Sequence, residues 1–310
     1  MGYLTSTERI SVDHTMQELK KHGTRDFPFQ VYFNNFLRYR EQLESWHYHG
    51  EMEFSLVLKG EFECGLNDQR YYLKEGDGIF VNSDVLHRYH VLRKYEESES
   101  ISILFMPQFL SGGRENLIYR RFVEPVAKDD GMQGEPLRRM ISWQAEILDC
   151  LMEIYRLSQN EDWITPLSMK NKLCTAWELF IRNRRQSGDL SPRSASDLLY
   201  EQRAKDILNY IHKHYQDPVE IADIARQLHI SRTECFRCFQ KITGESPKSY
   251  LNGYRIRQAM GRLEQTEESI TDICFSCGFN HMSYFVKRFR EYTGMSPGKY
   301  RKAVRELEKQ

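Results

Sequence analysis

The feature that most constrains the fold of this 310-residue chain is an internal repeat of about fifty residues near its end. Residues 221–250 and 270–300 carry the same apolar, glycine and proline positions twice. The pattern Ile-x-Asp-Ile opens each copy at an offset of 49, and Phe, Gly-x-Ser-Pro and Tyr close each copy at an offset of 50. Such a repeat indicates two copies of one supersecondary unit.

Each copy has the pattern of a helix, a short turn and a second helix. In the first copy, apolar residues spaced by three and four form a helical stripe over 221–228, and His229–Ser231 form the turn. In the second copy Gly278 supplies the turn. Gly244 and Gly294 stand where a left-handed C-cap is needed, and a Ser-Pro pair then begins the next helix. The sequence therefore predicts two helix-turn-helix units in one all-α domain.

The charge of the chain divides unequally between its two ends. Residues 201–310 hold 19 Lys and Arg against 14 Asp and Glu, a net charge of +5. The whole chain has 44 of each, so residues 1–200 hold 25 basic and 30 acidic side chains, a net charge of −5. This asymmetry predicts that the domain with the repeat, and not the front of the chain, binds a polyanion such as DNA.

The second helix of each unit is the one expected to enter the major groove, because a recognition helix presents its outward face to base edges and phosphates. Arg237 and Lys287 occupy equivalent positions on the two outward faces. Ordinary solvated helices also carry such charges, but here the whole pattern occurs twice. The predicted DNA-binding residues are Arg232, Thr233, Phe236, Arg237, His281, Met282, Ser283, Lys287 and Arg290.

Residues 203–301 resemble the AraC/XylS-type DNA-binding domain. The stretches that carry the resemblance are IADIARQLHIS, RCFQKITGESPKSY, YRIRQA, ITDICFSCGF and SYFVKRFREYTGMSPGKYR. The resemblance implies two recognition helices in successive major grooves of double-stranded promoter DNA, about 34 Å apart. RNA polymerase is a further partner to consider for such a regulator. Phe236 departs from the family, which usually has a polar residue there; an aromatic ring at this position would contact a thymine methyl or pack against the duplex.

Two Cys-x-x-Cys pairs, Cys235/Cys238 and Cys274/Cys277, have the spacing of a four-thiolate zinc site. Both pairs fall on predicted helices, and the repeat maps three of the four cysteines to core positions. Structural zinc sites normally place such pairs in tight turns. We therefore predict small buried thiols here rather than zinc ligands.

The front of the chain has the sequence of a β domain. Between Phe27 and about Met106, short apolar runs alternate with turn sequences, which favours a small barrel or sandwich. From about Leu137 the apolar spacing changes to three and four, which predicts helices. The expected organisation is an N-terminal arm (1–26), a β barrel (27–110), a mainly helical dimerisation segment (111–185), a linker (186–200) and the tandem helix-turn-helix domain (201–310).

Three side chains with metal-binding chemistry, His47, His49 and Glu53, fall at even spacing in the β region, and His87 follows further along the chain. On one continuous strand the first three would share a face. Three imidazoles and a carboxylate form a ligand set for iron, manganese or zinc. The alternative is that the same four side chains line an effector pocket through hydrogen bonds, without a metal.

This stretch resembles the cupin barrel. The first cupin motif, HxH(x3)E(x6)G, is met by residues 47–60. The second motif is met in part, because Gly76 and His87 fit whereas Asn82 and Asp84 replace the expected Pro and Gly. Cupin-like domains in front of AraC-type modules usually bind an effector and form dimers. The resemblance therefore implies a small-molecule effector, such as a sugar or another metabolite, and a homodimer.

As a whole, the sequence predicts a ligand-responsive transcription factor that binds promoter DNA sequence-specifically, requires no cofactor and is not an enzyme. The alternative is a metal-dependent cupin enzyme with a DNA-binding tail, which requires a bound metal with an open coordination position. No apolar run approaches the length needed to cross a bilayer, and the N-terminus lacks a secretory apolar stretch. We therefore expect a cytoplasmic protein.

Overall fold

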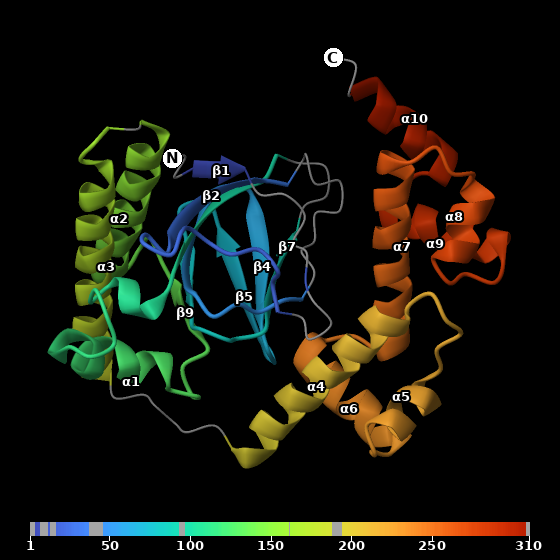
Figure 1. The fold of residues 1–310 in the computed structure, drawn as a ribbon, viewed down its shortest axis with the longest axis horizontal. Helices are drawn as coiled ribbons and strands as arrows, with labels where there is room; N and C mark the ends of the chain where they lie inside the picture. Colours follow the sequence, from blue (N-terminus) through green and yellow to red (C-terminus); the bar gives the residue numbers. More distant parts are fainter. Residues whose placement is uncertain are drawn as a thin grey trace. The chain divides into compact units, whose positions relative to one another are not determined.

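The structure, a computed structural model, describes residues 4–6, 12, 17–36, 46–92, 97–160, 162–187 and 194–307. Its contacts divide the chain into two compact units, Met1–Ala195 and Ser196–Gln310, which are described separately (Figure 1). Part of the expected linker at 186–200 lies outside the described residues, and helix α4 already begins within it, at Ala195. No described helix is both long and apolar enough to cross a membrane.

The described part of the front unit contains two β-sheets. The larger, six-stranded sheet has the order β1-β2-β8-β3-β6-β9, and the three-stranded sheet has the order β5-β4-β7. The six-stranded sheet includes β1 and β9, which lie outside the segment 27–110 expected for the barrel. The strands are β1 (Leu4–Ser6), β2 (Phe29–Asn35), β3 (Met52–Lys59), β4 (Glu61–Leu66), β5 (Gln69–Lys74), β6 (Gly78–Val81), β7 (His87–Val91), β8 (Glu99–Phe105) and β9 (Gly134–Leu137).

The alternation of side chains along the strands produces two cores. Phe54 and Phe80 point from the six-stranded sheet into a core that includes Phe180 of helix α3 (Thr165–Ser187), with ring centroids 6.0 and 4.7 Å away. Ile79 and Val81, which flank Phe80, belong to a separate core with the side chains of β4, β5 and β7. Because neighbouring residues of a strand face opposite sides, the second core lies between the two sheets.

Helix α2 (Ser142–Gln159) packs against α3, and both cover one face of the six-stranded sheet (Figure 1). We predict helix from about residue 137, but residues 134–137 form β9 and pair with β6. Helix α2 begins five residues later than predicted, at Ser142. The shorter helices of this unit are η1 (Pro107–Phe109), η2 (Tyr119–Val123) and α1 (Glu124–Ala127).

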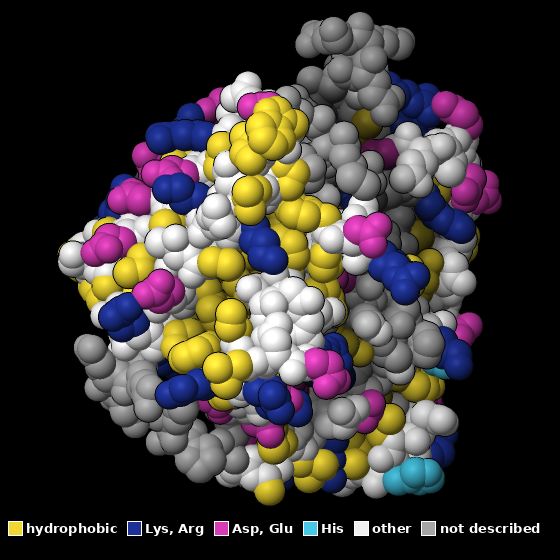
Figure 2. All heavy atoms as spheres, turned by 60° about the vertical axis from the view of Figure 1, so that its left-hand side comes forward, with side chains coloured by type: hydrophobic (Ala, Val, Ile, Leu, Met, Phe, Trp, Pro, Cys, Tyr) yellow, Lys and Arg dark blue, Asp and Glu magenta, His cyan; other side chains and the backbone are white. Residues whose placement is uncertain are grey.

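Apolar side chains remain at the surface of the helical part of the front unit. Figure 2 shows them gathered on the face turned toward the viewer, among scattered charged groups. The large apolar residues exposed in the segments around η2 and at the start of α3 are Leu117, Ile118, Phe122, Trp163 and Leu167.

The second unit is all-α, as predicted. The helix pairs α5–α6 and α8–α9 are the two helix-turn-helix units, and α7 joins them. The helices are α4 (Ala195–His214), α5 (Ile221–Gln227), α6 (Arg232–Thr243), α7 (Pro247–Gln265), α8 (Ile270–Ser276), α9 (Met282–Thr293) and α10 (Pro297–Leu307).

Local sequence explains where these helices begin and end. Ser231 caps α6 because its Oγ accepts a hydrogen bond from the Glu234 amide at 3.0 Å. Gly244 and Gly294 end α6 and α9 with φ of +78°, the left-handed C-cap that the sequence predicts. Gly278 makes the turn of the second unit at φ +83°.

The four cysteines of the Cys-x-x-Cys pairs are fully buried in this unit, which confirms their predicted core positions. Burial raises the pKa of the Cys235 thiol to about 12 and that of Cys277 to about 11. A raised pKa keeps a thiol protonated and unreactive at neutral pH.

Candidate functional site

Helix α6 has a buried face and an outward face. Cys235, Cys238 and Phe239 point into the core of the unit and are inaccessible to solvent. The opposite face carries the side chains that the sequence places there, and all of them are exposed. They are Arg232, Thr233, Phe236 and Arg237.

Helix α9 presents the second predicted set. His281, Ser283, Lys287 and Arg290 are exposed, whereas Met282 is half-buried because it packs against the core of this unit. His281 is the residue that precedes the first helical turn. Apart from Met282, the structure therefore brings the predicted residues of each copy to the outward side of the second helix.

The two outward faces differ in charge. On α6, Glu234 forms ion pairs with both Arg237 and Arg203. On α9, neither Lys287 nor Arg290 forms an ion pair within the described part of the chain. Arg237 on α6 is therefore already neutralised in part, and Arg288 on α9 is paired with Glu291. Arg232 on α6 and Lys287 and Arg290 on α9 remain available to phosphates.

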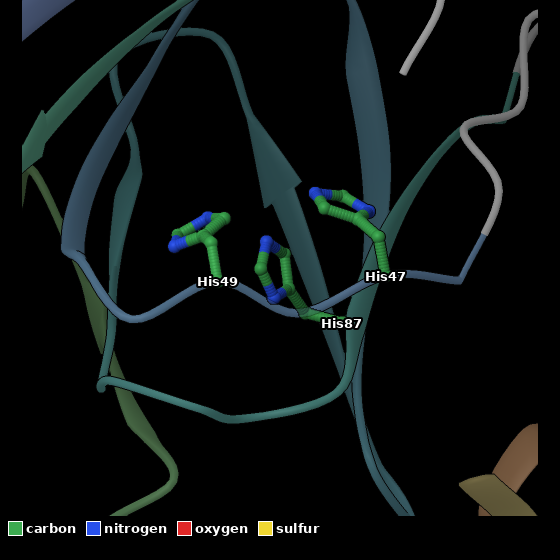
Figure 3. A group of neighbouring side chains, drawn as sticks. All are labelled: His47, His49 and His87. Atoms are coloured by element: carbon green, nitrogen blue, oxygen red, sulfur yellow. The ribbon is translucent and has the colours of Figure 1, made fainter. Parts of the chain in front are cut away.

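Three histidines come together inside the front unit (Figure 3). His47 and His87 lie directly opposite each other in a short antiparallel bridge, with backbone hydrogen bonds of 3.0 and 2.9 Å. The ring of His87 lies between the other two, 4.2 Å from the His47 centroid and 4.9 Å from the His49 centroid. All three side chains are buried, and their ligand nitrogens lie within 4.8 Å of one another.

The carboxylate of Glu53 completes the predicted set. Its Oε2 lies 3.4 Å from His49 Nε2 and 3.5 Å from His87 Nε2. Its Oε1 accepts hydrogen bonds from Ser55 Oγ at 2.5 Å and Tyr89 OH at 2.9 Å. Burial alone raises the pKa of this carboxyl, but the imidazoles of His49 and His87 hold it well below its ordinary value. Glu53 is therefore ionised.

The hydrogen bonds of two imidazoles determine which nitrogen faces Glu53. His49 Nδ1 lies 3.1 Å from the Glu51 carbonyl oxygen, and His87 Nδ1 lies 2.8 Å from that of Val85. A carbonyl only accepts, so Nδ1 carries the hydrogen and Nε2 of the neutral ring carries a lone pair. Neither Nε2 has a hydrogen-bond partner among the described residues. Two nitrogen lone pairs and an anionic oxygen that face one another form a set of donors suited to a cation.

The spacing of these atoms fits metal ligands. Two ligand atoms about 2.1 Å from a zinc-like ion lie roughly 3.4 Å apart at a tetrahedral angle. The separations of 3.4 and 3.5 Å from Glu53 Oε2 to the two imidazole nitrogens agree with that value. The backbone hydrogen bonds at Nδ1 are the kind of outer contact that orients a metal-binding histidine.

The local backbone differs from the prediction of one continuous strand. Glu53 lies in β3, but β3 begins at Met52, and His47 and His49 precede a bend at residues 50–51. The prediction of a shared strand face is therefore wrong. The side chains converge because the chain bends and because His47 pairs with His87.

The two departures from the second cupin motif have structural roles. Asp84 adopts φ +61°, so it occupies the left-handed conformation for which the motif has glycine. The side-chain amide of Asn82 donates hydrogen bonds to the carbonyls of Val126 and Met132 at 2.7 and 2.9 Å. Asn82 thereby ties the end of β6 to the segment that leads into β9.

Sequence reasoning missed two residues that approach the cluster from the N-terminal segment. The His22 ring centroid lies 5.5 Å from that of His49, and His22 Nε2 lies 3.2 Å from Glu18 Oε2. Burial raises the pKa of Glu18, but the imidazoles of His22, His47 and His49 lower it overall. The backbone amide of Glu18 donates to the carbonyl of Tyr48 at 2.9 Å, and no spacing rule predicts this pairing.

Sequence reasoning also missed a row of polar side chains in the six-stranded sheet. Ser102 Oγ lies 2.7 Å from Ser55 Oγ, and the Asn34 amide donates to Ser100 Oγ and Ser102 Oγ at 3.1 and 3.2 Å. These side chains are buried and continue from Glu53 across β3, β8 and β2. The alternation of serine with isoleucine in β8 is the sequence signal that would have found them.

Two family models match the chain. A helix-turn-helix domain matches residues 224–303, and a cupin domain matches residues 40–95. The first range contains helices α6 and α9, and the second range contains His47, His49, Glu53 and His87.

Similar proteins cover most of the chain. YdeC of Bacillus subtilis, an uncharacterized HTH-type transcriptional regulator, is 28% identical over 94% of this chain and 97% of that protein. The melibiose operon regulatory protein of Escherichia coli K12 is 25% identical over 83% of both chains. Among solved structures, the DNA-binding domain of AdpA, a global transcriptional factor, in complex with a target DNA is 27% identical with a TM-score of 0.34, over 35% of this chain and 97% of that one.

Proposed function

The chain is a transcription regulator of the AraC family in which a tandem helix-turn-helix domain follows a cupin domain, and we propose that its helices α6 and α9 read promoter DNA under the control of a small molecule bound in the cupin domain. The observation that carries this proposal is the repeated recognition helix. Each copy turns most of its apolar side chains inward and a set of exposed basic and polar side chains outward.

Selection of bound sequences from a random duplex library tests the DNA-binding part. Wild type should enrich a two-part motif whose parts lie about one helical turn apart. The double variant Arg237→Ala/Lys287→Ala, with one change on each recognition helix, should degrade both parts. Arg226→Ala is the matched control, because Arg226 is an exposed cation of α5 outside the recognition helices. No enrichment by wild type, with or without added metabolites, would contradict the proposal.

We place the effector in the interior of the cupin domain. The His47, His49, His87 and Glu53 cluster and the polar row that continues to Ser100 offer both donors and acceptors to a small polar ligand. One relative is named for the melibiose operon, so sugars, with melibiose first, are the initial probes. A sugar that raises the melting temperature of wild type and not that of Ser102→Ala would support this site, and one that stabilises both equally would contradict it.

We further propose that His47, His49, His87 and Glu53 hold a divalent transition metal. The orphaned Nε2 atoms of His49 and His87 beside an ionised carboxylate support this proposal. When bound, such an ion would supply a Lewis acid toward an effector oxygen. Metal analysis after loading with zinc, manganese or iron should give one ion per chain, lost in Glu53→Gln and retained in His281→Ala. The same metal content in Glu53→Gln as in wild type would contradict this ligand set.

We propose that a second copy of the chain covers the exposed apolar side chains of the front unit. Trp163, Leu167 and Leu117 are 86%, 54% and 64% exposed, and large apolar surfaces of this kind mark interaction sites. Two linked reading heads also gain affinity for DNA. Light scattering should give a dimer for wild type and a monomer for Trp163→Ser/Leu117→Ser. A monomeric wild type at micromolar concentration would contradict this proposal.

A further inference from the structure

Phe236 is an exposed phenyl ring on the outward face of the first recognition helix. It is 42% accessible to solvent, and it lies one turn after Arg232 and next to Arg237. The core of this unit does not need it, because Cys235, Phe239 and their neighbours already fill the buried face of α6. On the outward face of a recognition helix, such a ring lies where the edges of the bases are met in the major groove.

The surroundings of Phe236 indicate that this partner is DNA. The ring lines an open groove of about 570 Å³, together with apolar side chains and three charged ones. The charged residues of the lining are Glu220, Arg232 and Lys248. The apolar part of the lining suits an apolar group of a ligand, and the two cations outnumber the one carboxylate, which favours a polyanion. The major groove of DNA, which presents base edges between two phosphate backbones, meets both conditions.

The chemistry of a phenyl ring restricts which base it accepts. Phenylalanine neither donates nor accepts hydrogen bonds, so an adenine or cytosine amino group or a guanine carbonyl pressed against it loses its hydration without a replacement. Thymine differs because it presents a C5-methyl group in the major groove. The ring of Phe236 therefore favours thymine over the other three bases.

The second recognition helix provides an internal comparison. Val286 occupies the equivalent position at the repeat offset of 50, but it is smaller and already packs against the core of its unit. Its remaining surface is less available to a base than the ring of Phe236. The preference for a methyl group is thus expected mainly in the part of the site that α6 reads.

We infer that Phe236 reads the C5-methyl group of a thymine in the half-site bound by α6. This inference rests on the proposed DNA-binding function and adds the base and the atom that are recognised. Thr233, one turn earlier on the same groove, offers its own methyl group beside the ring. Burial of one methyl corresponds to about a fourfold change in affinity.

The test removes the methyl and changes nothing else in the DNA. In duplexes that carry the selected site, each thymine is replaced in turn by uracil, and dissociation constants are measured by fluorescence anisotropy. At one position in the α6 half-site, uracil should weaken wild type about fourfold and leave Phe236→Ala almost unaffected. At that position 5-methylcytosine should bind more tightly than cytosine. Phe236→Leu, which keeps an apolar side chain, should retain the methyl effect.

Phe275→Ala is the matched control, because Phe275 is a 53% exposed phenyl ring on α8 and not on a recognition helix. It should show the same sensitivity to uracil as wild type. Equal uracil sensitivity of wild type and Phe236→Ala at every thymine would overturn the inference, and so would a wild type that no uracil substitution weakens. In both cases the selected site would still support DNA binding. Failure to select any site would overturn both proposals.

Discussion

Replacing Gly278 by Ala tests why the second helix-turn-helix uses glycine at its turn. Gly278 has φ +83°, and a Cβ there would lie 2.4 Å from the Tyr215 carbonyl oxygen and 2.9 Å from two guanidinium nitrogens of Arg255. Arg255 is 9% exposed and donates hydrogen bonds of 2.6 Å to the carbonyls of Tyr215 and Asp217. An alanine must therefore adopt a left-handed conformation and also displace a buried charged donor.

The expected change in the free energy of unfolding follows from these two effects. A non-glycine residue in the left-handed region costs about 1–2 kcal/mol, and losing one hydrogen bond from a charged group adds about 1.5–3 kcal/mol. Alanine recovers roughly 0.5–1 kcal/mol because the unfolded chain is less flexible. Gly278→Ala should thus lower the free energy of unfolding by about 2–4 kcal/mol. His229→Ala is the control: His229 is exposed and already has φ +53° at the equivalent turn, so it should change stability by less than about 0.5 kcal/mol.

The distribution of tryptophan makes the assay specific to each unit. All four tryptophans, at 46, 143, 163 and 177, belong to the front unit. Tryptophan fluorescence therefore reports that unit, while far-ultraviolet circular dichroism reports the helices of both. Gly278→Ala should lower the urea midpoint of the dichroism transition of the second unit by about 1–3 M and leave the fluorescence transition unchanged. Equal stability of Gly278→Ala and His229→Ala would refute the reasoning.

Three further predictions concern charge. Lys287→Ala should reduce the slope of log affinity against log salt by about one, and Arg237→Ala by less, because Glu234 already neutralises Arg237; anisotropy titrations over a range of salt concentrations measure both slopes. Burial and a neighbouring arginine lower the pKa of His212 from 6.5 to about 3, so the unfolded chain binds an extra proton between these values. The second unit should lose about 2 kcal/mol of stability at pH 5 relative to pH 7, and His212→Gln should remove most of this loss from the urea midpoints. Glu53→Gln should weaken zinc binding at least tenfold in a chelator competition, since it removes the charged member of the proposed ligand set.

The sequence predicted the second unit closely because its signals are local. Each turn, cap and helix start depends on residues within a few positions, such as Ser231 on Glu234 or Gly244 at the end of α6. The repeat then provides each signal twice. The pairing of Glu234 with Arg203 was not predicted, because the two residues are 31 positions apart and meet only through the packing of α4 on α6.

The histidine cluster was predicted in its composition and not in its geometry. The cupin motif identified the four side chains, but the bend after His49 and the bridge between His47 and His87 depend on tertiary pairing. Glu18 and His22 reach the cluster through a backbone pairing with Tyr48 that no pattern in the sequence indicates. Side chains that close a site from another segment are therefore the part that sequence reasoning misses.

The outward faces of α6 and α9 carry different side chains, although the two helices share one repeat pattern. On α6 the outward face combines Phe236, which carries no charge, with two arginines. Glu234 offsets the charge of Arg237, whereas Arg232 forms no ion pair among the described residues. On α9, Lys287 and Arg290 face solvent without an ion pair among the described residues. Phosphate contacts supply affinity on any sequence, whereas contacts with base edges distinguish one sequence from another. With two such cations on α9 and one on α6, we expect α9 to supply the larger share of the general affinity, and the binding of α6 to depend more strongly on the base that it meets.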